Sequence, residues 1–164
     1  LMKNIILTKV IFYMFVTLFI QVFVPAFYYN GVYVVSDILI IFLTYLGFFY
    51  GRFYTIILGF IAGLTQDLVS NIDILGSMAF TKSIISFGLG GLFLYRNVWS
   101  IYFRMAYIFF IYFVHFFLFN FIKYSGVPIS LFTVLKIVLL NSILCFMLLI
   151  IIDKVFFNKG ILSR

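Results

Sequence analysis

The stretch that decides the fold is GFIAGLTQDLVSNIDILGSMAFTKSIISFGLGG, residues 59–91. Gly59, Gly63 and Asp67 recur at intervals of four, so a helix places them in one stripe. Small residues in such a stripe allow a second backbone to come close, which is how many membrane helices make contact. The stretch therefore predicts a close helix contact beside a carboxylate that faces a neighbouring helix rather than lipid.

The second half of the stretch continues this pattern after a polar break at residues 70–73. It places Lys82, Ser86 and Gly90 on one helix face by the same spacing of four. Because Asp67 ends one segment and Lys82 lies inside the next, our first hypothesis is a polar contact between them. The alternative is that each charge reaches the lipid headgroups, since Lys82 lies roughly 10 Å into its segment, within snorkelling distance.

The composition is that of an integral membrane protein. Of the 164 residues, 66% are hydrophobic and 9% are charged, whereas a soluble domain has about 25% charged residues. Lipid requires backbone groups to be paired within each segment, and the apolar runs lack the alternation of a membrane β-barrel, so we expect an all-α bundle. At roughly 20 residues for each span, the chain predicts a single domain of about six transmembrane helices. The predicted spans are residues 10–28, 33–50, 53–69, 74–95, 101–124 and 131–152.

The basic residues predict the orientation of these spans. The net charge is +7, and most of the eleven Lys and Arg residues fall at the ends that share a side with the N-terminus. These are Lys3, Lys9, Arg52, Arg96, Arg104, Lys154, Lys159 and Arg164. Lys123 falls at the other side, together with Asp37, Asp67 and Asp73. The positive-inside rule therefore places both termini in the cytoplasm. The first apolar run is long for a signal peptide and has no clear cleavage site, so we expect an uncleaved span.

A second small-residue pair lies between the predicted second and third spans. Gly47 and Gly51 are four residues apart, and only Gly51 and Arg52 separate the two spans. We therefore expect a tight antiparallel helical hairpin there. At the other end of the second span, Ser36 or Asp37 is expected to cap the helix, where an acid suits the positive end of the helix dipole.

The remaining polar residues do not form a recognisable catalytic or metal-binding constellation. His115 is the single histidine and Cys145 the single cysteine, so paired-histidine metal sites and an internal disulfide are excluded. We interpret His115, Asn120 and Asn141 as hydrogen-bonded packing residues within the bundle. No phosphate-binding loop or metalloprotease motif is present, and the scattered basic residues do not form a nucleic-acid surface. The sequence thus predicts no enzyme activity, no cofactor and no metal.

The middle of the chain resembles the bacterial rod shape-determining protein MreD family. The matching segments are SDILI (36–40), YLG (45–47), GFIAGLTQDLVS (59–70) and LGSMA (75–79). That family typically has Pro-Asp-Leu-Leu at the start of its second span, then Gly-Phe-x-x-Gly-Leu-x-x-Asp-x-x-Ser-Gly, then Leu-Gly and a small residue. This chain departs from the pattern at Ser36, which replaces the proline, and at Asn71, which replaces the glycine after Ser70.

The resemblance implies a non-catalytic scaffold in the inner membrane of a rod-shaped bacterium, within the machinery of peptidoglycan synthesis. Its direct partner would be a single-span protein similar to MreC. Its indirect partners would be the actin-like MreB, the glycosyltransferase RodA and an elongation transpeptidase. The family is also similar in span layout to the substrate-binding subunits of energy-coupling-factor transporters.

This leaves two functions open. The first is the scaffold, which would use its glycine and polar stripes for helix packing or partner contact. The residues assigned to that role are Asp37, Gly47, Gly51, Gly59, Gly63, Asp67, Gly76, Lys82, Ser86 and Gly90. The second is a membrane subunit that captures a vitamin-type small molecule. It would require an outward pocket lined by polar residues such as Asp67, Asn71, Asp73, Lys123 and Lys136.

Overall fold

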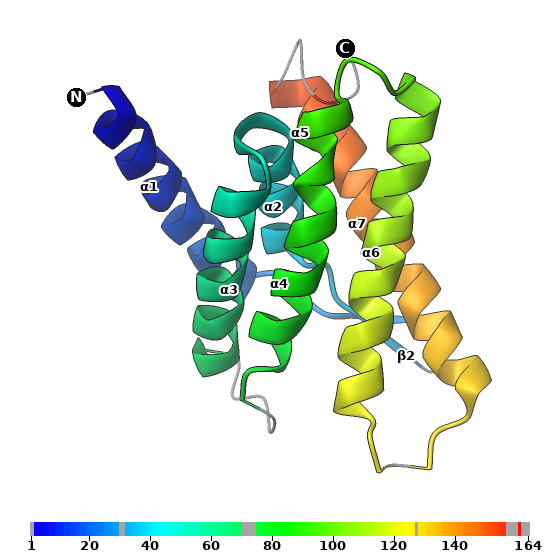
Figure 1. Ribbon diagram of the computed structural model, residues 1–164. Helices are drawn as coiled ribbons and strands as arrows, with labels where there is room; N and C mark the ends of the chain where they lie inside the picture. The colour runs from blue at the N-terminus through cyan, green and yellow to red at the C-terminus, as the bar shows by residue number, and fades with distance from the viewer. Residues whose placement is uncertain (1, 30–31, 70–74, 127, 157–160, 162–164) are drawn as a thin grey trace.

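The computed structural model describes residues 2–29, 32–69, 75–126, 128–156 and 161, and most of them are helical (Figure 1). The elements are α1 (Met2–Val22), β1 (Phe27–Tyr29), β2 (Val32–Val34), α2 (Ile38–Tyr50), α3 (Arg52–Val69), α4 (Ser77–Leu89), α5 (Gly91–Tyr95), α6 (Ile101–Lys123) and α7 (Leu131–Phe156). The expectation of a helical protein is therefore confirmed, with the addition of one short hairpin of strands.

Three helical stretches in the described part of the chain are long and apolar enough to cross a membrane. They are Ser77–Tyr95, which joins α4 and α5, Ile101–Lys123 and Leu131–Val155. Thr8–Val22 and Ile38–Tyr50 are apolar but shorter. At 1.5 Å a residue, the 13 residues of α2 cover about 20 Å, less than the roughly 30 Å of a bilayer core.

The first two predicted spans differ most from the structure. Helix α1 ends at Val22 rather than at residue 28, because Pro25 has no N–H to continue the helical ladder and disfavours helix in the residue before it. The chain then forms β1 and β2, which pair antiparallel with Phe27 opposite Val34. Helix α2 therefore begins at Ile38 rather than at residue 33.

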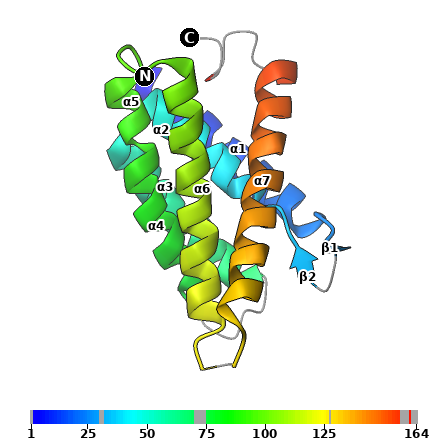
Figure 2. The same ribbon diagram turned by 90° about the vertical axis from the view of Figure 1, so that its right-hand side faces the viewer.

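The strand pair has a packing reason. Val32 and Val34 alternate inward and are buried against Ile137 of α7, while Tyr33 between them is exposed. Figure 2 shows the hairpin lying beside α7. This alternation of buried and exposed side chains is typical of a half-buried strand. The high hydropathy of the segment had instead indicated a helix.

The other helices lie close to the predicted ranges. Helices α3 and α6 start or end within one residue of the segments 53–69 and 101–124. Helix α7 continues one turn beyond residue 152. The predicted fourth span begins within residues 70–74, outside the described residues, and its described part is α4 and α5 with Gly90 between them.

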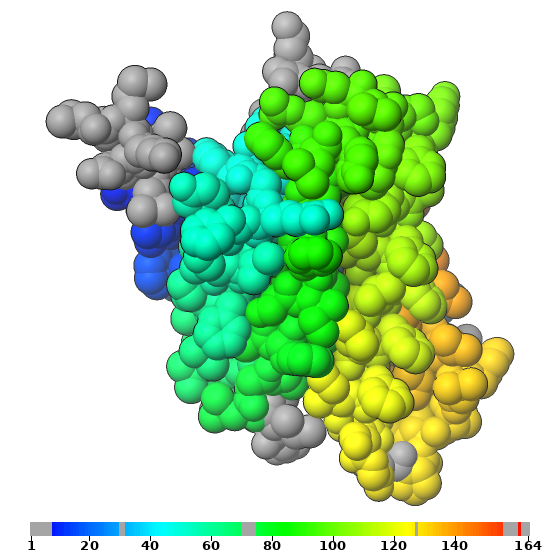
Figure 3. Space-filling view, in the orientation of Figure 1, coloured from blue at the N-terminus to red at the C-terminus, as the bar shows by residue number. Residues whose placement is uncertain are grey.

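The helices form a bundle in which α3 packs along α4, α4 against α6 and α6 against α7. Figure 3 shows α3, α4 and α6 covering one face in succession. Helix α2 lies inside the bundle, with Leu39, Ile40 and Leu43 fully buried. Helix α1 leans away from the others at its start (Figure 1). Since α2 is short, it occupies only the half of the bundle that holds the α2–α3 turn.

Candidate functional site

A buried group of ionisable residues surrounds the start of α2. Asp37 immediately precedes α2, Lys82 comes from α4 and His115 from α6. The Lys82 ammonium donates to Asp37 Oδ2, and His115 Nε2 lies 3.2 Å from the same oxygen. A carboxylate only accepts, so Nε2 carries the proton in this contact. Lys82 and His115 are fully buried and Asp37 is 4% exposed, so one carboxylate joins three elements inside the bundle.

Asp37 also holds the first turn of α2. Its Oδ1 accepts from the backbone N–H of Leu39 at 3.1 Å, which confirms the predicted N-cap. Gln21 of α1 supports the same turn: its amide donates to the Ser36 carbonyl at 2.9 Å and accepts from the Ile38 N–H at 2.6 Å. Cys145 of α7 accepts from the Asp37 N–H at 3.2 Å. Backbone polar groups at the start of this buried helix are therefore paired.

Asp67 likewise accepts hydrogen bonds from the start of a helix, in this case α4. The residue at the N-cap of α4 is Gly76, which has no side chain to offer. Asp67 reaches across from α3 and accepts from the backbone N–H groups of Gly76, Met78 and Ala79, each at 3.1 Å. The Ser77 hydroxyl donates to it at 3.3 Å. An anion at a helix N-terminus is stabilised by these N–H groups and by the helix dipole.

The glycine stripe of α3 faces the backbone of α4, as the spacing predicted. A Cβ added at Gly63 would lie 2.5 Å from Ala79 Cα and 2.6 Å from the Met78 carbonyl oxygen. A Cβ at Gly59 would collide with the Ser86 hydroxyl. The close approach of α3 to α4 is what brings Asp67 to the first turn of α4.

The glycines of the second pair, Gly47 and Gly51, have different roles, and Gly90 makes a further close contact. A Cβ at Gly47 would lie 2.6 Å from the Leu89 carbonyl oxygen, so α2 also touches α4 closely. Gly90 would collide with Arg52 if it carried a Cβ. Gly51 instead permits the sharp α2–α3 turn, since its φ of 78° lies in the left-handed region that favours glycine.

The polar contact expected between Asp67 and Lys82 was wrong. Lys82 pairs with Asp37, and Asp67 binds the backbone of α4. The headgroup alternative was wrong as well, because Lys82 is fully buried and Asp67 is 2% exposed. Asp37 was expected at the outer end of its span, but the late start of α2 places it within the bundle.

His115 was predicted to pack through a hydrogen bond, and it does so, but its contact with Asp37 was not predicted. Its position in the middle of an apolar helix was the available signal, since ionisable residues at such positions usually have a charged or polar partner. The partner itself, 78 residues away, could not be deduced from spacing. His115 Nδ1 is buried without a hydrogen bond in the described part of the chain.

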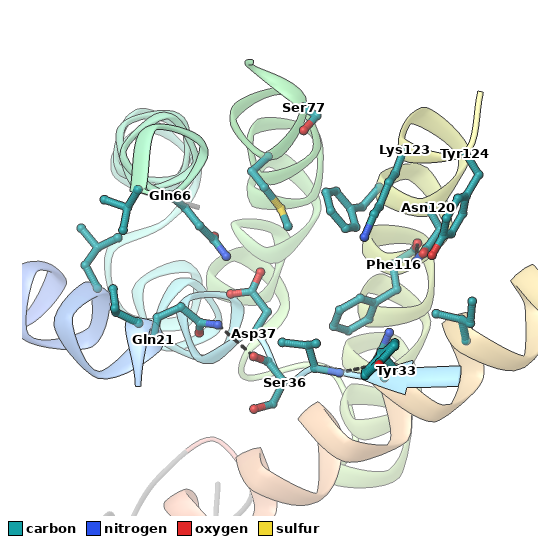
Figure 4. Close-up of a pocket in the computed structure, with 18 of the residues that line it drawn as sticks. Gln21, Tyr33, Ser36, Asp37, Gln66, Ser77, Phe116, Asn120, Lys123 and Tyr124 are labelled. Carbon is teal, nitrogen blue, oxygen red and sulfur yellow. Dashed lines mark hydrogen bonds between the residues drawn. The ribbon is translucent and has the colours of Figure 1, made fainter. Parts of the chain in front are cut away.

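A cavity of about 1120 Å³ lies directly beyond the start of α2. Asp37 lines it on one side, and Phe116, Asn120 and Lys123 of α6 line it on another (Figure 4). Its walls also come from α1, β2, α3 and the starts of α4 and α7. The cavity exists because α2 begins late, so no helix fills the second half of the bundle.

The cavity includes only part of the pocket expected from the sequence. Lys123 lines it, but Asp67 and Lys136 do not. Asn71 and Asp73 lie outside the described residues. The amides of Gln21, Gln66, Asn120 and Asn141, which were not assigned to a pocket, supply much of the polar lining instead.

No protein-family model, curated protein or solved structure matches this chain. No group of three or more His, Cys, Asp or Glu residues among those described could hold a metal ion.

Proposed function

We propose that this protein is a non-catalytic scaffold of the cell-wall elongation complex in the bacterial inner membrane, similar to MreD. One observation carries the proposal: both acids of the family-like motif accept hydrogen bonds from the first backbone N–H groups of buried helices. Asp37 caps α2 and pairs with Lys82, while Asp67 caps α4. The motif that suggests the family is thus a device for fixing helix positions, which suits a protein whose function is positional.

The scaffold would cross the membrane about six times with both termini in the cytoplasm. The arrangement supports this, because the start of α1, the α2–α3 turn, α5 and the end of α7 lie at one end of the bundle (Figure 1). Arg52, Arg96 and Lys154 belong to these regions. Lys123 lies at the opposite end, where α6 terminates. Helix α2, which is short, would complete its span together with the strands that precede it.

In this mechanism the rigid α3–α4 pair forms the frame, and an outer surface receives the partner. Large apolar side chains such as Phe12, Phe53 and Phe110 are more than half exposed, so the bundle has broad faces for lipid or for another span. A single-span protein similar to MreC would dock on such a face. Through it the scaffold would set the positions of MreB, RodA and the elongation transpeptidase.

Co-purification in mild detergent tests this proposal. The full chain, co-expressed with an MreC-like single-span protein, is expected to retain that protein through affinity purification and size-exclusion chromatography. An unrelated single-span protein expressed at the same level is the control and is expected to be lost. A folded preparation that retains neither protein contradicts the scaffold function.

A membrane subunit that captures a small molecule is the second candidate, and the cavity favours it. Its volume exceeds the range of about 300–1,000 Å³ usual for ligand pockets, and its lining combines apolar walls with a few polar groups. A screen of vitamins for an increase in the melting temperature tests this function. A transport role further requires that the chain co-purify with an ATP-hydrolysing module rather than with the MreC-like protein.

A further inference from the structure

We propose that the cavity beyond α2 binds an anionic amphiphile, a molecule with a large apolar body and one phosphate or carboxylate group. Such binding depends on the lining of the cavity and is compatible with either of the two functions above. Three features carry it: the size of the cavity, the state of its polar groups and the position of Lys123, the cationic side chain among its described lining residues.

The size and walls of the cavity fit an apolar body. At about 1120 Å³ it is larger than most sites for drug-sized ligands. Phe15 and Phe19 of α1 and Phe116 and Phe119 of α6 line it from opposite sides. A cavity with apolar walls favours an apolar occupant over ordered water. Acyl chains or a fused aromatic system would pack against these rings.

Most polar groups around the cavity already have partners within the protein. Gln21 uses both ends of its amide on the Ser36 carbonyl and the Ile38 N–H. Asn141 accepts from the Val35 N–H at 2.8 Å. The Asp37 carboxylate is paired with Lys82 and His115. These groups hold the chain at residues 35–38, so they are not available to bind the polar part of a ligand.

Lys123 is different, because its ammonium has no carboxylate partner among the described residues. It lies 5.9 Å and 5.5 Å from the ring centres of Phe119 and Tyr124, and its side chain points toward the space enclosed by the cavity (Figure 4). Asn120, one helical turn earlier, also lines the cavity, and its amide nitrogen donates to the Phe116 carbonyl at 2.7 Å. A cation at one end and apolar walls beyond it define the polarity of the ligand: its acidic group at Lys123 and its apolar body toward α2.

Two sources could supply this chemistry, an anionic membrane lipid and a soluble aromatic acid. Native mass spectrometry and thermal unfolding of the full chain in dodecyl maltoside distinguish them, with dioleoyl phosphatidylglycerol and 1-naphthoate as probes. Dioleoyl phosphatidylcholine, which has the same chains without net charge, is the control for general lipid effects. We expect one of the two anionic probes to bind and to raise the melting temperature more than phosphatidylcholine does.

Two variants connect binding to the cavity. Lys123→Gln removes the cation, and we expect about tenfold weaker binding of the anionic probe, the size of a charge-assisted hydrogen bond. Thr65→Phe places a large uncharged ring in the cavity from α3. The Thr65 hydroxyl donates to carbonyls of its own helix, so its loss breaks no contact with another element. The Thr65→Phe variant is expected to abolish binding. Lys154→Gln, at an exposed position outside the cavity lining, is the matched control and should bind as the unmodified chain does.

The proposal is overturned if neither anionic probe binds better than phosphatidylcholine, or if binding is unchanged in both Lys123→Gln and Thr65→Phe. Binding of phosphatidylglycerol identifies a lipid source, and binding of naphthoate alone identifies a soluble one. Failure here leaves the retention of an MreC-like partner unaffected, so the scaffold function is tested separately.

Discussion

The ammonium of Lys82 in α4 donates to the carboxylate of Asp37, 45 positions earlier in the chain, and both side chains are almost fully removed from solvent. The pair connects the first turn of α2 to α4, and His115 adds α6 to the same carboxylate. Isolated charges are very costly in such surroundings, so each partner requires the other. The two helices are thereby held at one relative position.

Removal of one partner should therefore be strongly destabilising. In Lys82→Met the Asp37 carboxylate stays buried without its cationic partner, and we expect a loss of about 3–5 kcal/mol in the free energy of unfolding. Unfolding by sodium dodecyl sulfate from mixed micelles measures this. The exposed Lys154→Met is the control and should change stability little.

The double variant Asp37→Asn/Lys82→Met tests the cause of that loss. The asparagine can still cap α2, and no uncompensated charge remains. We expect the double variant to be more stable than Lys82→Met alone, with a coupling of about 0.5–3 kcal/mol. If the loss of stability in the double variant equals the sum of the losses in the two single variants, the ion pair is not the cause.

The α3–α4 contact should not accept even one additional methyl group at Gly63. The Cβ of Gly63→Ala would lie 2.5 Å from a backbone atom of α4, so the helices must separate, and we expect a loss of about 1–3 kcal/mol. Gly91→Ala is the matched control, since its Cβ would lie at an ordinary 3.5 Å from the Tyr107 hydroxyl. The changes in melting temperature caused by Gly63→Ala and Gly91→Ala should differ in sign or clearly in size. Equal melting temperatures contradict the close contact.

Asp67 should protect the first turn of α4 from hydrogen exchange. Asp67→Ala leaves the N–H groups of Met78 and Ala79 without their acceptor, and we expect a loss of about 1–2 kcal/mol. Exchange at these two amides, measured by mass spectrometry of α4 peptides, should accelerate. Asp67→Asn keeps one acceptor oxygen, so its exchange rate should lie between those of the unmodified chain and Asp67→Ala. Unchanged exchange at the start of α4 in Asp67→Ala contradicts the capping role.

The sequence was most informative where spacing within one segment determines the structure. The interval of four between Gly59 and Gly63 placed both on the side of α3 that meets α4, and the tight turn at Gly51 followed from the short gap between apolar runs. Composition and run length were sufficient to predict a helical protein with helices able to cross a membrane.

The candidate site could not be derived in this way, because its partners meet only through the crossing of helices. Asp67 and Lys82 are close in sequence, yet Asp37 is the acid that α2 brings to Lys82. The cavity depends on the late start of α2, which in turn depends on the strands before it. Asn30 and Gly31, between two valine- and tyrosine-rich segments, were a hairpin signal that hydropathy outweighed.

The predicted topology can be tested by labelling of single cysteines in a Cys145→Ser background. Asn97→Cys lies in the connection after α5, and Ser125→Cys lies after α6 at the opposite end of the bundle. With the termini in the cytoplasm, a membrane-impermeant maleimide added to intact spheroplasts should label Ser125→Cys and spare Asn97→Cys. Disruption of the membrane should expose both. Labelling of Asn97→Cys in intact spheroplasts contradicts this orientation.

The native Cys145 provides a direct measure of how firmly α2 is held. It is the single cysteine of the chain, it is fully buried, and it accepts a hydrogen bond from the Asp37 N–H at 3.2 Å. N-ethylmaleimide, which enters membranes, can reach it only when the bundle opens locally. We expect slow modification of the folded protein and at least about tenfold faster modification in Lys82→Met, because each 1.4 kcal/mol lost from the opening free energy increases the open population tenfold. Lys154→Met, on the same helix as Cys145 but exposed, should react at the unmodified rate. If Cys145 of the folded protein reacts as fast as it does after denaturation, the close packing of α7 against the start of α2 is wrong.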